Sequence, residues 1–128
     1  MSEHATQNGQ RYMTEISRLL RIAEKAEKYG HHQWRDDILE RIQEMPLSIT
    51  VRDGWHEPGQ LTDEGPVEYE ILLTYGGPAL RVWGELDDYS QPRNAYLQWQ
   101  DWGTPWTRLH KQDPDDLLTF AQNFYYGE

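Results

Sequence analysis

The sequence contains no cysteine, which excludes disulfide bonds, thiolate metal ligands and a cysteine nucleophile. Its apolar runs are only a few residues long, far short of the roughly 20 residues that a transmembrane helix needs. The first ten residues, MSEHATQNGQ, have neither the basic nor the apolar segment of a signal peptide. We therefore expect a cytoplasmic protein, in a host cell, with no contact with the membrane.

Motifs for nucleotide or metal chemistry are missing as well. The sequence has no GxGxxG and no P-loop, and none of its five histidines has the spacing of a zinc site. His56, beside Glu57, is the histidine best placed for catalysis, but the sequence shows no partner set for it. We expect no cofactor, no bound metal and no catalytic residue.

The 128 residues are a one-domain length, and we expect a single domain over residues 1–128. Aromatic residues are 12% of the chain, with six Trp and eight Tyr against two Phe. Because Trp and Tyr combine an apolar ring with a polar group, they suit interfaces as well as cores.

The first part of the chain has helical periodicity. Apolar residues recur at intervals of three and four in two segments separated by Gly30, which predicts a helical hairpin over residues 10–45. The stripe of the first segment is Tyr12, Met13, Ile16, Leu19, Leu20, Ala23 and Ala26, and that of the second is Trp34, Ile38, Ile42 and Met45. Pro46 ends the second helix, and residues 1–9 are expected to be disordered.

From residue 46 the period changes to two. Alternation predicts an antiparallel meander of four strands within residues 46–110, at about 47–51, 67–75, 79–87 and 95–102. Gly84, in the middle of the third strand, indicates a bulge or a close backbone approach. Asp113 and Pro114 begin a helix over residues 113–126. The predicted fold class is α+β, with the helices and the sheet in two layers.

The chain is acidic, with a formal net charge of −10. Residues 1–45 hold seven Lys and Arg against eight Asp and Glu, whereas residues 46–128 hold five against fourteen. Such a field repels nucleic acid and attracts basic protein surfaces. The alternative is that the acidity only aids solubility.

Acidic and aromatic residues interleave on the strands and loops of the predicted sheet. Carboxylates spaced along a sheet among aromatic rings can imitate phosphates for a protein with a basic groove. The candidate partner-binding residues are Glu68, Glu70, Trp83, Glu85, Asp87, Asp88, Tyr89 and Trp55. The alternative is an ordinary polar outer face. For Trp55, in a polar loop, folding back onto the core is favoured over a role as a binding anchor. The sequence does not decide whether Trp83 is a core residue or a residue that contacts the partner.

The stretch GGPALRVWGELDDYSQPRNAYLQWQDWGTPW resembles small proteins of phages and other mobile elements of proteobacteria, a group that includes anti-CRISPR proteins. The shared features are GGP, the GELD end of a strand, DWGTPW and a helix ending near FYYG, over about residues 47–127. The resemblance implies an inhibitor that binds a host CRISPR effector complex and blocks recognition of nucleic acid. It transfers no catalytic residue.

Three functional hypotheses follow. The first is an anti-CRISPR-like inhibitor that occludes a basic nucleic-acid-binding surface of the effector complex, touches no nucleic acid itself, and acts as a monomer or homodimer. The second is an acidic immunity or antitoxin-like protein that neutralises one basic toxin. The third and weakest is a small carboxylate-dependent enzyme using Glu85, Asp87 or His56.

Overall fold

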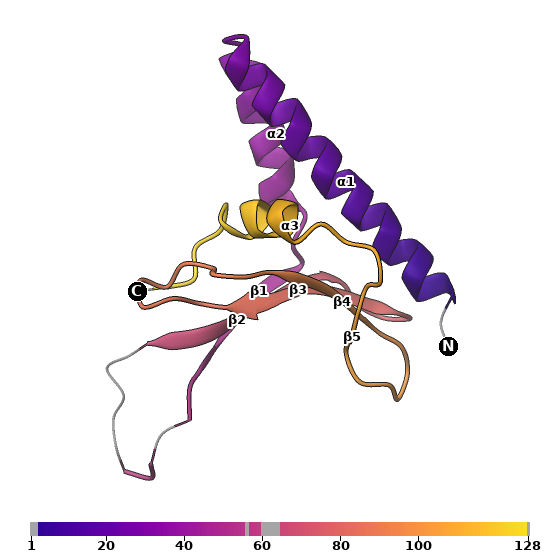
Figure 1. The fold of residues 1–128 in the computed structure, drawn as a ribbon, viewed down its shortest axis with the longest axis vertical. Coiled ribbons are helices and arrows are strands. Elements are labelled where there is room, and N and C mark those ends of the chain that lie inside the picture. The colour runs from indigo at the N-terminus through magenta and orange to yellow at the C-terminus, as the bar shows by residue number, and fades with distance from the viewer. Residues whose placement is uncertain (1–2, 56, 60–64, 128) are drawn as a thin grey trace.

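The computed structural model describes residues 3–55, 57–59 and 65–127, which form an α+β fold (Figure 1). The elements in chain order are α1 (Glu3–Lys28), α2 (His32–Glu44), β1 (Ser48–Asp53), β2 (Pro66–Thr74), β3 (Ala79–Glu85), β4 (Tyr96–Gln100), β5 (Thr107–Arg108) and α3 (Pro114–Ala121). The strands form one antiparallel sheet in the order β1-β2-β3-β4-β5. The α+β class, the helix pair and the meander are confirmed.

The sheet has five strands, so the prediction of four was wrong. The extra strand follows a tight turn in which the Thr104 amide donates to the Asp101 carbonyl at 2.9 Å and Gly103 takes a φ of 75°. This turn reverses the chain and pairs Thr107 with Trp99. A two-residue strand carries too little alternation to be seen in a sequence.

The helices all lie on one side of the sheet (Figure 1). The strand residues that face them are buried and join the apolar side of α1 and α3 in one hydrophobic core. The sheet contributes Tyr69, Ile71, Leu73, Leu80, Val82 and Leu97, and the helices contribute Met13, Ile16, Leu19, Leu20, Ile38, Ile42, Leu117 and Phe120. No helix of the described residues lies over the opposite face of the sheet (Figure 1).

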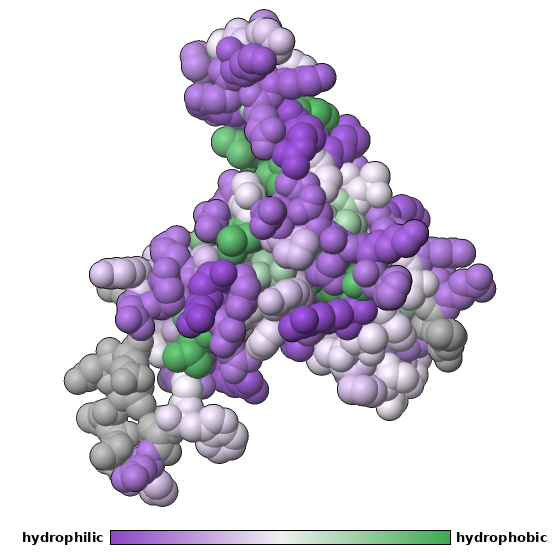
Figure 2. Space-filling model, viewed as in Figure 1, coloured by the Kyte–Doolittle hydropathy of each residue, from purple (hydrophilic) through white to green (hydrophobic). Residues whose placement is uncertain are grey.

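The helix pair stands away from the sheet for much of its length (Figure 1). Gly30 has a φ of 73° and forms the turn after α1. The Gly30 amide donates to the Glu27 carbonyl and the His31 amide to the Ala26 carbonyl, which ends α1. Hydrophilic side chains cover most of this projection (Figure 2), and Trp34, predicted on the apolar stripe, is 47% exposed. The layered arrangement therefore applies to α1 and α3, whereas α2 packs mainly on α1. In the described residues, no helix combines the length and apolarity that crossing a bilayer requires.

The N-terminal segment is helical from Glu3, although residues 1–9 were predicted to be disordered; Met1 and Ser2 lie outside the described residues. Ala5 and Gly9 are both buried. A Cβ on Gly9 would lie 2.8 Å from Leu109 Cδ1, so the missing side chain lets α1 approach the sheet closely. That contact explains why a polar segment is ordered there.

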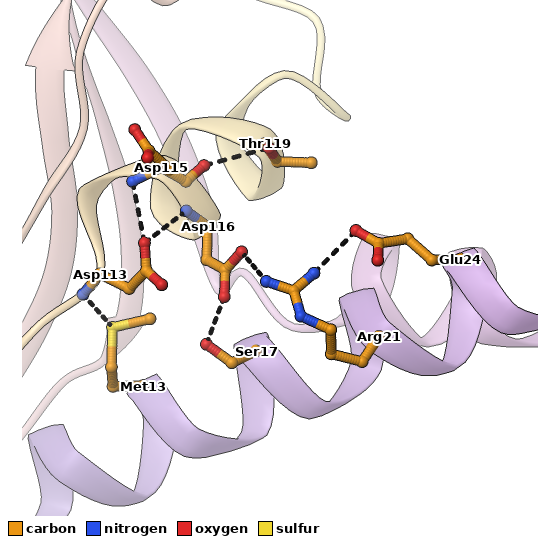
Figure 3. Close-up of polar contacts among 8 residues, drawn as sticks. All are labelled: Met13, Ser17, Arg21, Glu24, Asp113, Asp115, Asp116 and Thr119. Carbon is orange, nitrogen blue, oxygen red and sulfur yellow. Dashed lines mark hydrogen bonds and ion pairs between the residues drawn. The ribbon is translucent and has the colours of Figure 1, made fainter.

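Helix α3 is fixed to α1 by a carboxylate (Figure 3). Asp113 caps α3 by accepting from the amides of Asp115 and Asp116, as predicted. Asp116, 6% exposed, accepts from Ser17 Oγ at 2.7 Å and from Arg21 Nη2 at 2.5 Å. The hydrogen bond to Asp116 is the main cause that raises the pKa of Arg21 above its usual range.

Helix α3 ends at Ala121, five residues earlier than predicted. The chain then turns so that Tyr126 packs its ring on Tyr69 at 4.9 Å between centroids and donates its hydroxyl to the Ala121 carbonyl at 2.6 Å. A helix continued through Tyr126 would lose both contacts.

Gly84 lies where the Tyr69 ring and the Asn94 carbonyl both come close to the backbone of β3. It pairs with Tyr69, whose hydroxyl donates to the Asn94 carbonyl at 2.6 Å. A Cβ built on Gly84 would lie 2.1 Å from the Asn94 oxygen and 2.8 Å from the Tyr69 ring. The close approach that the sequence indicated at Gly84 is confirmed.

We expect Gly84→Ala to lower the free energy of unfolding by about 3 kcal/mol, because overpacking strains a rigid core. Chemical denaturation followed by tryptophan fluorescence measures it. Gly54→Ala is the matched control: the nearest atom to its new Cβ is Val67 Cγ2 at 3.5 Å, an ordinary contact. The control should change stability by less than about 0.5 kcal/mol. Equal effects of the two substitutions would contradict this account of Gly84.

Alkaline pH should destabilise the fold through the buried tyrosine pair. Burial raises the pKa of Tyr69 and of Tyr126 well above the ordinary value. Above pH of about 10 the unfolded chain loses phenolic protons that the folded chain keeps, so the free energy of unfolding falls as pH rises further. Below that pH this contribution is constant.

The double variant Tyr69→Phe/Tyr126→Phe removes both titrating groups. We expect it to be less stable at pH 7, by about 1 kcal/mol for each lost hydrogen bond, but to decline less than the wild type between pH 9 and 11. Tyr75→Phe, at a site 81% exposed, should decline like the wild type. Parallel declines in all three proteins would refute the assignment.

Candidate partner-binding surface

The helix-free face of the sheet carries three of the predicted partner-binding residues, and they are tied into cross-strand contacts. Glu68 on β2 pairs with Arg52 on β1, with 2.5 Å between Arg52 Nη2 and Glu68 Oε2. Its other oxygen accepts from Trp83 Nε1 on β3 at 3.0 Å. Trp83 in turn stacks near Tyr96 on β4, with centroids 6.4 Å apart and planes 25° apart. Trp83 is therefore not a core residue, since it lies half-buried on the face away from the core.

Glu70 is neutralised in the same way. Arg81 Nη1 lies 2.5 Å from Glu70 Oε2, and Arg81 Nε donates to Gln98 Oε1 at 2.7 Å. The guanidinium sits over the Trp106 ring, 4.2 Å from its centroid, which adds a cation–π contact. The Arg81 side chain is 16% exposed. Through these contacts Arg81, on β3, joins β2, β4 and Trp106, the residue before β5.

A depression of about 420 Å³ follows these contacts across the sheet. Its polar lining is Arg52, Glu68, Glu70, Arg81 and Gln98, with Trp83 and Trp106 beside them. Each glutamate there has an arginine partner. This part of the outer face therefore presents no excess negative charge, although the sequence suggested an acidic face.

Four of the remaining predicted residues, Glu85, Asp87, Asp88 and Tyr89, lie at the end of β3 and in the loop that follows it. Glu85 accepts from Asn94 Nδ2 at 2.9 Å, and its amide donates to Asn94 Oδ1 at 2.8 Å. Asp87 accepts from the amides of Tyr89 and Gln91 at 2.8 and 3.0 Å. These donors are neutral, so neither carboxylate has a cation as its partner in these bonds. The bonds hold the 86–92 loop in a tight shape that turns Asp88 and Tyr89 outward.

The register places this loop at the same end of the sheet as the end of β1, with β2 between them. Asp53 pairs with Pro66 at the start of β2, and Glu85 pairs with Glu68 two residues further on. Asp53, Glu85, Asp87 and Asp88 are exposed carboxylates, and we call them, together with the exposed side chains of Trp55 and Tyr89, the acidic end. Arg93 is the exposed cation that follows the loop. Negative charge therefore exceeds positive charge here, unlike on the sheet face.

Trp55 does not fold back onto the core, contrary to the favoured prediction. Its side chain is fully exposed, and that of Tyr89 is 85% exposed. Among the described elements, no helix covers the end of the sheet at which β1 finishes (Figure 1). His56 lies outside the described residues.

The sequence did not reveal the part played by the arginines. Alternation placed Arg52 and Arg81 on outer faces, but only the strand register shows that each meets a glutamate. Among the described residues, no group of three or more His, Asp or Glu is arranged to hold a metal ion. Comparisons with protein-family models, with curated proteins and with solved structures found no match for this chain.

Removing Arg81 should destabilise the sheet. Arg81→Ala leaves the Glu70 carboxylate, 30% exposed, without its partner and uncovers Trp106, so we expect a loss of about 2 kcal/mol in unfolding free energy. Chemical denaturation measures the loss, and a shifted tryptophan emission maximum reports the uncovered ring. The control Arg93→Ala removes an exposed arginine and should cost less than about 0.5 kcal/mol. Equal losses would show that the network contributes nothing to stability.

Proposed function

We propose that this chain is a stoichiometric inhibitor of the anti-CRISPR kind, which binds a basic nucleic-acid-handling surface of a host CRISPR effector complex in the host cytoplasm. It acts by occupying that surface and needs no catalysis, no cofactor and no contact with nucleic acid itself. The acidic end makes the contact. In this proposal Glu85, Asp87, Asp88, Tyr89 and Trp55 touch the partner directly.

The observation that carries the proposal is the uneven pairing of charge. Glu68 and Glu70 have arginine partners. Among the described residues, Glu85 and Asp87 are hydrogen-bonded by neutral groups alone, and Asp88 is exposed in the same loop. Unpaired carboxylates held in a defined geometry attract a complementary basic surface over a distance and set its orientation.

The exposed aromatic rings supply what charge alone does not. Burying Trp55 and Tyr89 in a partner would remove large apolar areas from water, and Trp and Tyr are the residues that most often dominate binding energy at interfaces. Glu68, Glu70 and Trp83 have a different part in this proposal. Their network stiffens the sheet from which the acidic end projects, so less order has to be gained on binding.

The test is capture from a lysate of a CRISPR-bearing host, with the tagged chain as bait and matched washes at low and high salt. Asp53→Lys/Asp88→Lys reverses two charges of the acidic end, and Glu40→Lys/Glu44→Lys makes the same net change on exposed positions of α2. We expect effector subunits to be recovered by the wild type and the α2 variant. The acidic-end variant should bind at least about tenfold more weakly.

Raised salt should weaken binding too, because exposed charges are screened within about 8 Å at physiological ionic strength and within less at higher salt. Recovery of one small basic protein in place of a ribonucleoprotein would favour the immunity-type function. If the acidic-end variant and the α2 variant bind alike, the acidic end is not the contact.

A further inference from the structure

The sheet has one long free edge. β1 lies at the end of the strand order and pairs with β2 on one side, while β5 at the other edge is two residues long. Apart from half-buried Ile49, every residue of β1 is exposed. In the described residues no strand pairs with its second side. An edge of this kind offers a row of backbone donors and acceptors to another strand.

The register shows which backbone groups face outward. The Leu86 amide donates to the Val67 carbonyl, so residues 67, 69 and 71 of β2 direct their backbone groups to β3. The alternate residues, 68, 70 and 72, then face β1, where their partners are Arg52, Thr50 and Ser48. The amides and carbonyls of Ile49 and Val51 therefore point away from the sheet.

The side chains on this edge are apolar on the helix side. Ile49 and Val51 pair with Ile71 and Tyr69, which are core residues, so their side chains lie on the helix side; Val51 is 45% exposed there. Arg52 does not guard the edge, because its side chain is drawn to Glu68 across the outer face. Residues 48–51 of the edge thus lack the charge that usually blocks strand pairing.

We infer that β1 pairs antiparallel with β1 of a second copy of this chain, about a two-fold axis at Thr50. In that register Ile49 lies opposite Val51 of the second copy, and Val51 lies opposite Ile49 of the second copy. Each of these two pairs forms two backbone hydrogen bonds. The same register joins the apolar side chains of both copies on one side of a ten-stranded sheet. β-branched cross-strand pairs of this kind stabilise a sheet.

Self-complementary side chains at Ile49 and Val51 favour a second copy as the occupant, and charge favours the antiparallel direction. Asp53 comes to lie opposite residue 47 of the second copy, so the two acidic ends point to opposite ends of the dimer and repel each other least. Asp87, Asp88 and Tyr89, which lie in the loop after β3, stay open to a partner in both copies. The interface therefore does not depend on the function proposed above, and the two can fail separately.

The first test is the mass of the wild type in solution. Sedimentation at about 100 µM, a concentration that populates even weak dimers, should give twice the 15.2 kDa chain mass. Val51→Pro removes an outward amide and no bond to β2, and it should sediment as a monomer. Val51→Thr keeps the amide and the β-branch and should remain dimeric. A monomeric wild type overturns the inference.

The absence of cysteine makes a second test possible, since any introduced thiol is alone in its chain. Across a two-fold axis at Thr50 the two Cα atoms of a non-hydrogen-bonded pair lie about 4.5 Å apart, within disulfide range. Thr50→Cys should therefore form a disulfide-linked dimer under mild oxidation. Ser48→Cys is the control, because its two copies lie four strand residues apart, about 13 Å. Equal cross-linking of the two variants overturns the register.

Discussion

The missing side chain of Gly84 is the constraint on which the rest of the sheet depends. It allows the Tyr69 ring and the Asn94 carbonyl to meet over β3, within distances that any Cβ would forbid. Asn94 then holds Glu85 through both backbone and side chain, which positions the loop that carries Asp87 and Asp88. The other side of Tyr69 receives Tyr126 and ends α3. One glycine thus links the core, the C-terminal segment and the acidic end.

The two faces of the sheet are stabilised by different kinds of interaction. The face toward the helices is held by apolar burial, and its stability depends on packing. The other face is held by arginine–glutamate and arginine–aromatic contacts across strands, so its polar groups are satisfied without a covering layer. Those contacts neutralise Glu68 and Glu70 in pairs, whereas Glu85, Asp87 and Asp88 at the end of the sheet are exposed carboxylates.

The free edge of β1 and the acidic end lie at neighbouring positions of the sheet but offer different kinds of interaction to a partner. The edge offers backbone hydrogen bonds and apolar side chains, which suit a strand of complementary sequence. The acidic end offers charge and two exposed rings. An antiparallel dimer would use the first and leave the second open, giving a bivalent molecule whose two binding ends face apart.

The sequence by itself determined the elements whose period extends over many residues. The helix pair, the long strands, the Asp113 cap and the close approach at Gly84 were all readable because they depend on local spacing and backbone chemistry. Tertiary structure decided the two-residue β5, the ordering of residues 3–9 against Leu109 and the exposure of Trp55. It also decided that Arg52 and Arg81 neutralise Glu68 and Glu70. Those outcomes depend on strand register and on where the helices stop covering the sheet, which no local pattern encodes.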